Sequence, residues 1–249
     1  MRKSIAMVAV ALLALVTLAA GAALAAGAAD TLAKADALYQ QRVDLAKARQ
    51  ALDLYEQAFK QDPSGVNAAR VAQCAYWVGK HLKDDDAKAA MFERGIKACK
   101  AALKAAPDDI PATYWLGVSY SVYGKAKGIT KSLGLVDTIK ELMKKVIAKD
   151  PAYMGGGAYR VLGRVYFKLP GIFGGDNDKS IEYLKLAIKY GPQHWLSHLY
   201  LAETYLDEDE DAKAKVLLEQ IIAGKPLPGS EPEDAEIKAQ ARKLLKEEF

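Results

Sequence analysis

Five prolines follow the ends of amphipathic helical segments at nearly regular intervals along the chain. They are Pro63, Pro107, Pro151, Pro192 and Pro226, and the segments before the first four are ALDLYEQAFKQDP, GIKACKAALKAAP, TIKELMKKVIAKDP and SIEYLKLAIKYGP. Proline ends a helix because it lacks a backbone N–H and clashes with the preceding turn. A second helical pattern follows each proline, most regularly in YWLGVSYSVYGK, YRVLGRVYFK and LYLAETYL. The sequence therefore predicts an all-α solenoid of antiparallel helix pairs, an architecture that builds binding surfaces and rarely carries chemistry.

The last full unit resembles the tetratricopeptide repeat (TPR) family, because Pro192 and Pro226 are 34 residues apart. With Trp195 as the first repeat position, the family's large, small and aromatic positions fall on Leu201, Ala202 and Tyr205, and its second-helix positions on Ala214 and Leu218. The earlier proline spacings of 44, 44 and 41 residues predict elongated helices or longer connecting loops. From about residue 233 to 249 we expect a polar capping helix with the apolar stripe Ile237, Ala241, Leu244 and Leu245.

The N-terminus has the pattern of a secretion signal. Arg2 and Lys3 precede an apolar run from Ile5 to about Ala20, and Ala23-Leu24-Ala25 suits signal peptidase. We expect residues 1–25 to be cleaved and residues 26–249 to form one repeat domain in the periplasm, although the apolar run is also long enough for a retained anchor. No cysteine follows it, so a lipoprotein is not expected.

The charge of the mature chain is nearly balanced. Removal of Arg2 and Lys3 leaves 33 of the 35 basic residues against 31 acidic ones, a net charge of +2. No basic stripe alternates with aromatic residues, so nucleic acid is not an expected partner. The alternatives for Cys74 and Cys99 are a disulfide across one hairpin, which an oxidising compartment permits, and two small buried thiols.

No motif predicts an enzyme, a metal site or a cofactor. His194 and His198 are four residues apart, but a third ligand is missing, so surface or packing roles are favoured. The glycine run in Tyr153–Arg160 has no phosphate-loop spacing, which favours a flexible connector. In the insertion LPGIFGGDNDKS, we expect Asp176 to cap a helix from about Asn177, Gly174 and Gly175 to permit the sharp approach, and Ile172 and Phe173 to pack beneath.

The concave face of such a solenoid is lined by first helices. The family's groove-facing positions fall on Gln73, Tyr76, Trp77, Tyr114, Val118, Val122, Arg160, Arg164, Phe167, Lys168, Leu196, Leu199 and Glu203. This wall is aromatic and apolar, with two arginines one helical turn apart. Two guanidinium groups at this spacing form a clamp for a carboxylate or phosphate. The alternative is that one or both pair with acidic side chains or lie in solvent.

A narrower resemblance covers most of the chain from Tyr114 onward. The run GGGAYRVLGRVYFKLPGIFGGDNDKS, with the segments that follow it, resembles the periplasmic TPR proteins grouped with the T component of TRAP transporters. The shared pattern is a glycine-rich entry, R-x-L-G-R-x-Y, and L-P-G-x-x-G-G-D before a helix. The resemblance implies an all-α bundle with a ligand-accessible cleft or pore and an accessory role beside a periplasmic solute-binding subunit, in uptake of small organic acids or hydrophobic ligands.

Two functions are compatible with these patterns. In the first, the protein is a transporter accessory whose groove holds a small hydrophobic or anionic ligand. In the second, it is a periplasmic scaffold whose groove holds a peptide or a partner helix. A homo-oligomer is compatible with both, and neither involves catalysis. An enclosed apolar pocket beside Arg160 and Arg164 favours the first function, and an open continuous groove favours the second.

Overall fold

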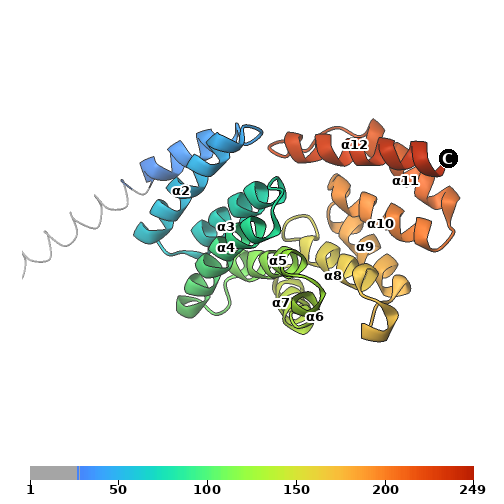
Figure 1. The fold of residues 1–249 in the computed structure, drawn as a ribbon, viewed down its shortest axis with the longest axis horizontal. Helices are drawn as coiled ribbons and strands as arrows, with labels where there is room; N and C mark the ends of the chain where they lie inside the picture. The colour runs from blue at the N-terminus through green and yellow to red at the C-terminus, as the bar shows by residue number, and fades with distance from the viewer. Residues whose placement is uncertain (1–26, 28) are drawn as a thin grey trace, which may run out of the picture.

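The computed structural model describes Gly27 and residues 29–249, all of whose regular elements are helical. The expected signal segment, residues 1–25, lies outside the described residues. Among the described helices, none combines the length and the apolar character that a membrane crossing requires. Figure 1 shows the helices following one another along a curved path, as the all-α repeat prediction requires.

The helices form successive antiparallel pairs. The helix over residues 29–39 pairs with α2 (Leu45–Gln61), α3 (Gly65–Lys80) with α4 (Asp85–Ala105), and α5 (Ile110–Lys127) with α7 (Val136–Lys149). The short helix α6 (Ile129–Leu133) lies between α5 and α7. The next pairs are α8 (Gly157–Lys168) with α9 (Asn177–Tyr190) and α10 (Trp195–Asp207) with α11 (Asp211–Ala223), and α12 (Glu231–Glu248) follows. The 3-10 turn η1 (Gly171–Phe173) lies within the α8–α9 connection.

The second helix of every pair ends just before a proline. Helices α2, α4, α7 and α9 end two residues before Pro63, Pro107, Pro151 and Pro192, and α11 ends three residues before Pro226. The long proline spacings have both of the expected causes. Helix α4 has 21 residues, and α6 lengthens the connection between α5 and α7.

The buried residues follow the repeat register. Ser180, Leu184 and Ala187 are fully buried on α9, as are Ala214 and Leu218 on α11. Glycines allow the closest helix contacts: a Cβ on Gly163 would lie 2.6 Å from Leu184 Cγ, and one on Gly117 would lie 2.3 Å from Met143 Cε. The predicted capping helix is α12, whose Ile237 and Ala241 are buried.

The apolar interior consists of two main clusters rather than one. The first extends from Ala35 to Leu162 and includes residues of α2 to α5, α7 and α8. The second extends from Leu184 to Ala241 and includes residues of α9 to α12. The two clusters meet at the α8–α9 hairpin. The repeat is therefore continuous along the chain, while its core is divided into an N-terminal half and a C-terminal half.

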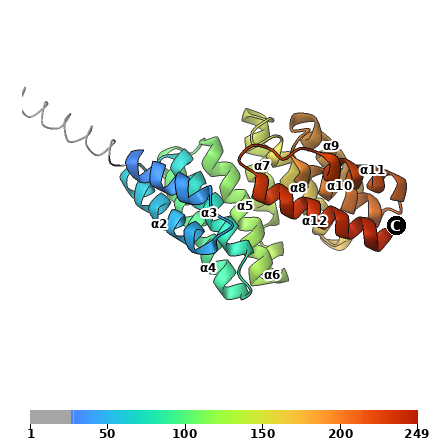
Figure 2. The same ribbon diagram turned by 90° about the horizontal axis from the view of Figure 1, so that it is seen from above.

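The solenoid curves until its two ends meet. Helix α12 packs along α10 and α11, and its first turns approach the N-terminal helix pairs (Figures 1 and 2). Arg42, which precedes α2, forms an ion pair with Glu233 of α12. Contacts between residues so distant in the sequence close the helical path into a ring.

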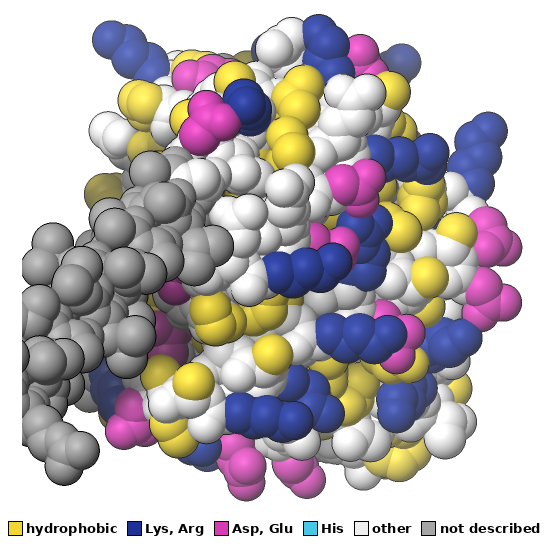
Figure 3. All heavy atoms as spheres, turned by 90° about the vertical axis from the view of Figure 1, so that its left-hand side faces the viewer, with side chains coloured by type: hydrophobic (Ala, Val, Ile, Leu, Met, Phe, Trp, Pro, Cys, Tyr) yellow, Lys and Arg dark blue, Asp and Glu magenta, His cyan; other side chains and the backbone are white. Residues whose placement is uncertain are grey.

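On the end of the molecule seen in Figure 3, basic and acidic side chains are interspersed.

The structure contains two free cysteines instead of a disulfide. Cys99 Sγ of α4 faces Ala68 O of α3 at 3.8 Å, whereas Cys74 Sγ faces Ala48 O of α2 at 3.3 Å. Cys74 lies six residues farther along α3 than Ala68, a displacement of about 9 Å along the helix axis. This offset is larger than the roughly 4.4–6.8 Å between Cα atoms that a disulfide requires. Burial raises the pKa of both thiols to about 12.

Candidate binding site

The glycine run before α8 fixes where Arg160 lies. Gly155 and Gly156 have left-handed φ angles of 58° and 69°. A Cβ on Gly157 would lie 2.7 Å from Tyr114 Oη, so only glycine lets α8 begin this close to α5. The glycine run is therefore a tightly packed turn that leads into α8, and its interpretation as a flexible connector is wrong. The first turn of α8 then carries Arg160 into the interior, with only 8% of the residue exposed.

Every hydrogen bond of the Arg160 guanidinium goes to a neutral acceptor. Nη1 donates to Ser197 Oγ at 3.2 Å, and Nη2 donates to Tyr114 Oη at 3.5 Å and to Met154 O at 3.4 Å. These bonds are longer than the usual 2.9–3.0 Å. No ion pair to Arg160 occurs among the described residues. A buried charge without a counterion is costly, so the local structure is suited to a negatively charged group.

Arg164 lies one turn farther along α8 and has a different environment. Its Nη1 forms an ion pair with Glu203 of α10. Its Cζ lies 4.1 Å from the centre of the Tyr200 ring and 5.3 Å from that of Phe167. The charge of Arg164 is therefore balanced within the protein. The predicted clamp of two arginines reduces to one unbalanced guanidinium, that of Arg160.

Histidine contributes no positive charge beside Arg160 at neutral pH. Burial, followed by the charge of Arg160, lowers the pKa of His194 to about 4. Burial also lowers the pKa of His198, whose Nδ1 is 3.5 Å from His194 O. Both imidazoles are consequently neutral at pH 7. No cluster of metal-ligating side chains occurs around them or elsewhere in the described part of the chain.

Tyrosines from three helices surround this region. Tyr114 is buried and packs against the Trp115 and Tyr153 rings, with centroids 5.5 and 5.4 Å away. Tyr76 lies 6.4 Å from the Trp115 ring. Burial raises the pKa of Tyr76, with a smaller contribution from Tyr200 and Tyr114. Burial also raises the pKa of Tyr200, against the opposing charges of Arg164 and Arg160, so both phenols are neutral. The direct partners of Arg160 are therefore uncharged, and the Arg164–Glu203 ion pair lies one helical turn away.

The other predicted groove residues are divided between several environments. Gln73 and Val118 are half-buried, Phe167 is half-buried beside Arg164, and Lys168 is exposed with Nζ 4.4 Å from the Phe167 ring. Trp77 is buried, and its Nε1 donates to Arg42 O at 2.7 Å, so it belongs to the contact between the chain ends. The sequence analysis did not identify Ser197, whose Oγ accepts a hydrogen bond from Arg160 Nη1.

The α8–α9 loop has the predicted cap but not the predicted packing. The Asp176 side chain accepts a hydrogen bond from Lys179 N at 2.9 Å at the start of α9. Gly174 has a φ of 85°, and a Cβ on Gly175 would lie 1.8 Å from Leu169 O. Ile172 and Phe173 are 87% and 51% exposed, so the expectation that they pack beneath the loop is wrong. The tight turn directs both side chains outward.

The α10–α11 hairpin carries a shallow apolar depression that is separate from the Arg160 region. Its volume is about 360 Å³. Its lining is Leu201, Tyr205, Ala212, Lys213, Val216 and Leu217. None of these residues belongs to the predicted concave face, and Lys213 is balanced by Glu210 at 2.7 Å. This depression therefore has no unbalanced charge comparable to that of Arg160.

Comparisons with known proteins find one matching sequence family and several solved structures with a similar fold. The family model described as TRAP transporter T-component matches residues 20–248. A search of curated protein sequences finds no match. Among solved structures, TTC0263, a thermophilic TPR protein of Thermus thermophilus, is similar with a TM-score of 0.60 and 19% identity, covering 86% of this chain and 98% of that one. The pilF protein of Pseudomonas aeruginosa gives a TM-score of 0.54 and 14% identity, covering 90% and 94%. These structures indicate the TPR fold.

Proposed function

The chain belongs to the TRAP transporter T-component family, and from this premise we propose that it is a periplasmic accessory of a TRAP-type uptake system that holds a small amphipathic anion beside Arg160. The expected export signal supports the periplasmic location. The TPR fold supports a protein-binding role, with the solute-binding subunit of the transporter as the partner. No step of this function requires catalysis or a cofactor.

The burial of Arg160 among neutral partners carries the ligand proposal. An arginine fork binds a carboxylate or phosphate with two parallel hydrogen bonds. The long bonds from Arg160 to Ser197, Tyr114 and Met154 would be exchanged for shorter ones to the ligand. Because Glu203 already balances Arg164, one uncompensated positive charge remains. A ligand with a single negative charge therefore fits better than one with two.

The apolar part of the ligand is expected to contact the surrounding aromatic rings. Tyr76, Tyr114 and Tyr200 come from three first helices, α3, α5 and α10. Their phenol rings offer apolar faces together with hydroxyl groups that can donate hydrogen bonds. The combination of one guanidinium and several tyrosines is suited to an organic acid with an aromatic or aliphatic body.

Native mass spectrometry of the protein purified from periplasm tests this function. We expect the wild-type protein to carry a small acid and Arg160→Met to lose it. The matched control is Arg164→Met combined with Glu203→Met, which removes a balanced pair one turn away and is expected to keep the ligand. Retention of the same molecule by Arg160→Met would contradict the ligand proposal. A bound polypeptide in place of a small molecule would favour the alternative function, a scaffold for a peptide or partner helix.

A further inference from the structure

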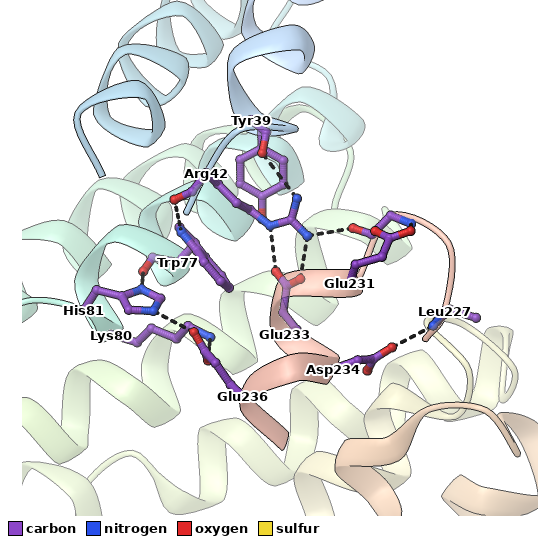
Figure 4. A network of polar contacts seen from close by, with 11 residues as sticks. Tyr39, Arg42, Trp77, Lys80, His81, Leu227, Glu231, Glu233, Asp234 and Glu236 are labelled. Carbon is purple, nitrogen blue, oxygen red and sulfur yellow. Dashed lines mark hydrogen bonds and ion pairs between the residues drawn. The ribbon is translucent and has the colours of Figure 1, made fainter. Parts of the chain in front are cut away.

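The contact between the two ends of the ring is made by charged side chains. Arg42 Nε donates to Glu233 Oε1 at 2.9 Å, and its Nη2 donates to Glu233 Oε2 and, at 2.7 Å, to Gly229 O. The Arg42 side chain is only 2% exposed. Its Cζ lies 4.7 Å from the centre of the Tyr39 ring and 5.2 Å from that of Trp77. Figure 4 shows Arg42, which precedes α2, bound to both carboxylate oxygens of Glu233 on α12.

A second carboxylate of α12, one turn after Glu233, pairs with two bases of the N-terminal half. Glu236 Oε2 accepts from Lys80 Nζ at 2.6 Å, and Glu236 Oε1 is 2.8 Å from His81 Nε2. His81 Nδ1 is 2.7 Å from Trp77 O, so its other nitrogen faces the carboxylate (Figure 4). We call Arg42, Lys80, His81, Glu233 and Glu236 the closing contact.

The opposite side of α12 has a different chemical character. Ile237 and Ala241 are buried with residues of α10 and α11, and Leu244 and Leu245 pack against the same cluster. Within the described residues, no side chain of α12 belongs to the apolar clusters that contain the N-terminal helices. Helix α12 is therefore fixed to the C-terminal half by apolar packing and joined to the N-terminal half by charge pairs.

The two attachments respond differently to solution conditions. The Lys80–Glu236 pair is partly exposed and weakens with salt, because the screening length falls from about 30 Å at 0.01 M to about 3 Å at 1 M. The Arg42–Glu233 pair is more buried and is screened less. Apolar packing does not weaken in this way. The two halves of the core also meet at the α8–α9 hairpin, on the far side of the ring from the closing contact. The closely packed α8–α9 hairpin keeps the two halves connected, so the closing contact can separate without detaching either half.

We propose that α12 is a latch: the ring opens when the closing contact separates, while α12 remains packed on α10 and α11. Opening moves the N-terminal half away from α12 and exposes the inward faces of α3, α5, α8 and α10. Arg160 lies on one of these faces, so the latch would control entry of the ligand. Only this last consequence rests on the proposed function.

Hydrogen–deuterium exchange of the full chain tests the latch without a ligand. In Glu233→Gln combined with Glu236→Gln, we expect amides in residues 39–45, 76–83 and 229–236 to exchange at least tenfold faster. Amides in residues 240–247 should keep their wild-type rates, because α12 stays on α10 and α11. Raising the salt concentration from 0.01 to 1 M should accelerate exchange in residues 76–83 of the wild-type protein more than in residues 39–45, because the Lys80–Glu236 pair is more exposed than Arg42.

The matched control is Glu247→Gln, which removes an exposed pair with Lys243 on the same helix, away from the closing contact. It should leave all three N-terminal and loop segments at wild-type rates. Unchanged exchange in residues 39–45 of the double variant would overturn the latch. Equal loss of protection in residues 240–247 would also overturn it, because α12 would then leave the C-terminal half altogether. Small-angle X-ray scattering should show a larger radius of gyration for the double variant at the same protein concentration.

Discussion

Arg42 and Glu233 are 191 residues apart in sequence, yet the buried guanidinium of one is bound by two hydrogen bonds to the carboxylate of the other. A solenoid ordinarily has contacts only between neighbouring repeats. This pair joins the first helix pair to the last helix, so each end of the chain stabilises the other. The unfolding of the two halves is therefore coupled through the closing contact as well as through the α8–α9 hairpin.

Removal of Glu233 should destabilise the whole chain, because it leaves Arg42 buried without its carboxylate. We expect Glu233→Gln to lower the free energy of unfolding by about 3 kcal/mol. Replacement of both partners, Arg42→Met with Glu233→Leu, should recover most of this loss, since no buried charge remains. Urea unfolding measures both. Equal destabilisation in the single and double variants would show that the loss does not come from an unpaired charge.

The close approach of α8 to α5 should depend on Gly157. In Gly157→Ala, the new methyl group would lie 2.7 Å from Tyr114 Oη and displace the ring that contacts Arg160. We expect a loss of about 1–3 kcal/mol in the free energy of unfolding. Gly171→Ala is the control, because a Cβ there meets nothing within 4 Å, and it should change stability by less than about 0.5 kcal/mol.

Acid should destabilise the protein through His194. Its pKa is about 4 in the folded protein, against 6.5 for an unperturbed histidine, so the unfolded chain binds more protons between these values. Stability is therefore fully present above pH 6.5 and falls as the pH decreases toward 4. The slope should be smaller in His194→Gln, as thermal melts across this window will measure. An unchanged slope would mean that other groups, His198 first, cause the acid effect.

A bound anion should be detectable at the same histidine. The positive charge of Arg160 contributes to the low pKa of His194, second to burial. An anion on Arg160 cancels this repulsion, so the pKa of His194 should rise when the natural ligand is bound. NMR titration of the imidazole in the ligand-bound and ligand-free protein checks this shift. A lower pKa in the ligand-bound protein would contradict the placement of the anion beside Arg160.

Arg160 should contribute little to the stability of the ligand-free protein. A buried guanidinium with only neutral partners costs desolvation energy that long hydrogen bonds do not offset. We therefore expect Arg160→Met to have an unchanged or higher melting temperature than the wild-type protein after ligand removal. A structural role for Arg160 predicts the opposite, a destabilisation of about 2 kcal/mol or more from the lost buried hydrogen bonds.

The repeat pattern allowed the helix ends and the core positions to be predicted. Each proline marks a local backbone constraint, and residues such as Ala214 and Leu218 occupy the buried positions that the repeat register predicts. The environment of Trp77 could not be predicted from this pattern. The register places it on the groove, but Arg42, which lies outside the repeated positions, covers it.

Contacts across the ring depend on the accumulated rotation of all helix pairs. Each rotation is set by side-chain packing, so small differences decide whether α12 reaches Arg42 at all. The difference between Arg160 and Arg164 has a similar origin. Both project from one face of α8, but only Arg164 lies opposite a carboxylate of α10. The sequence identified the two arginines, whereas their partners required the three-dimensional structure.

The most direct measurement is a crystal structure of the protein purified from periplasm without denaturation. We expect density for a small organic acid, with its carboxylate bound by the Arg160 guanidinium and its body against Tyr76, Tyr114 or Tyr200. Density for a ligand elsewhere, such as in the α10–α11 depression, with Arg160 still bonded only to Ser197, Tyr114 and Met154, would contradict it.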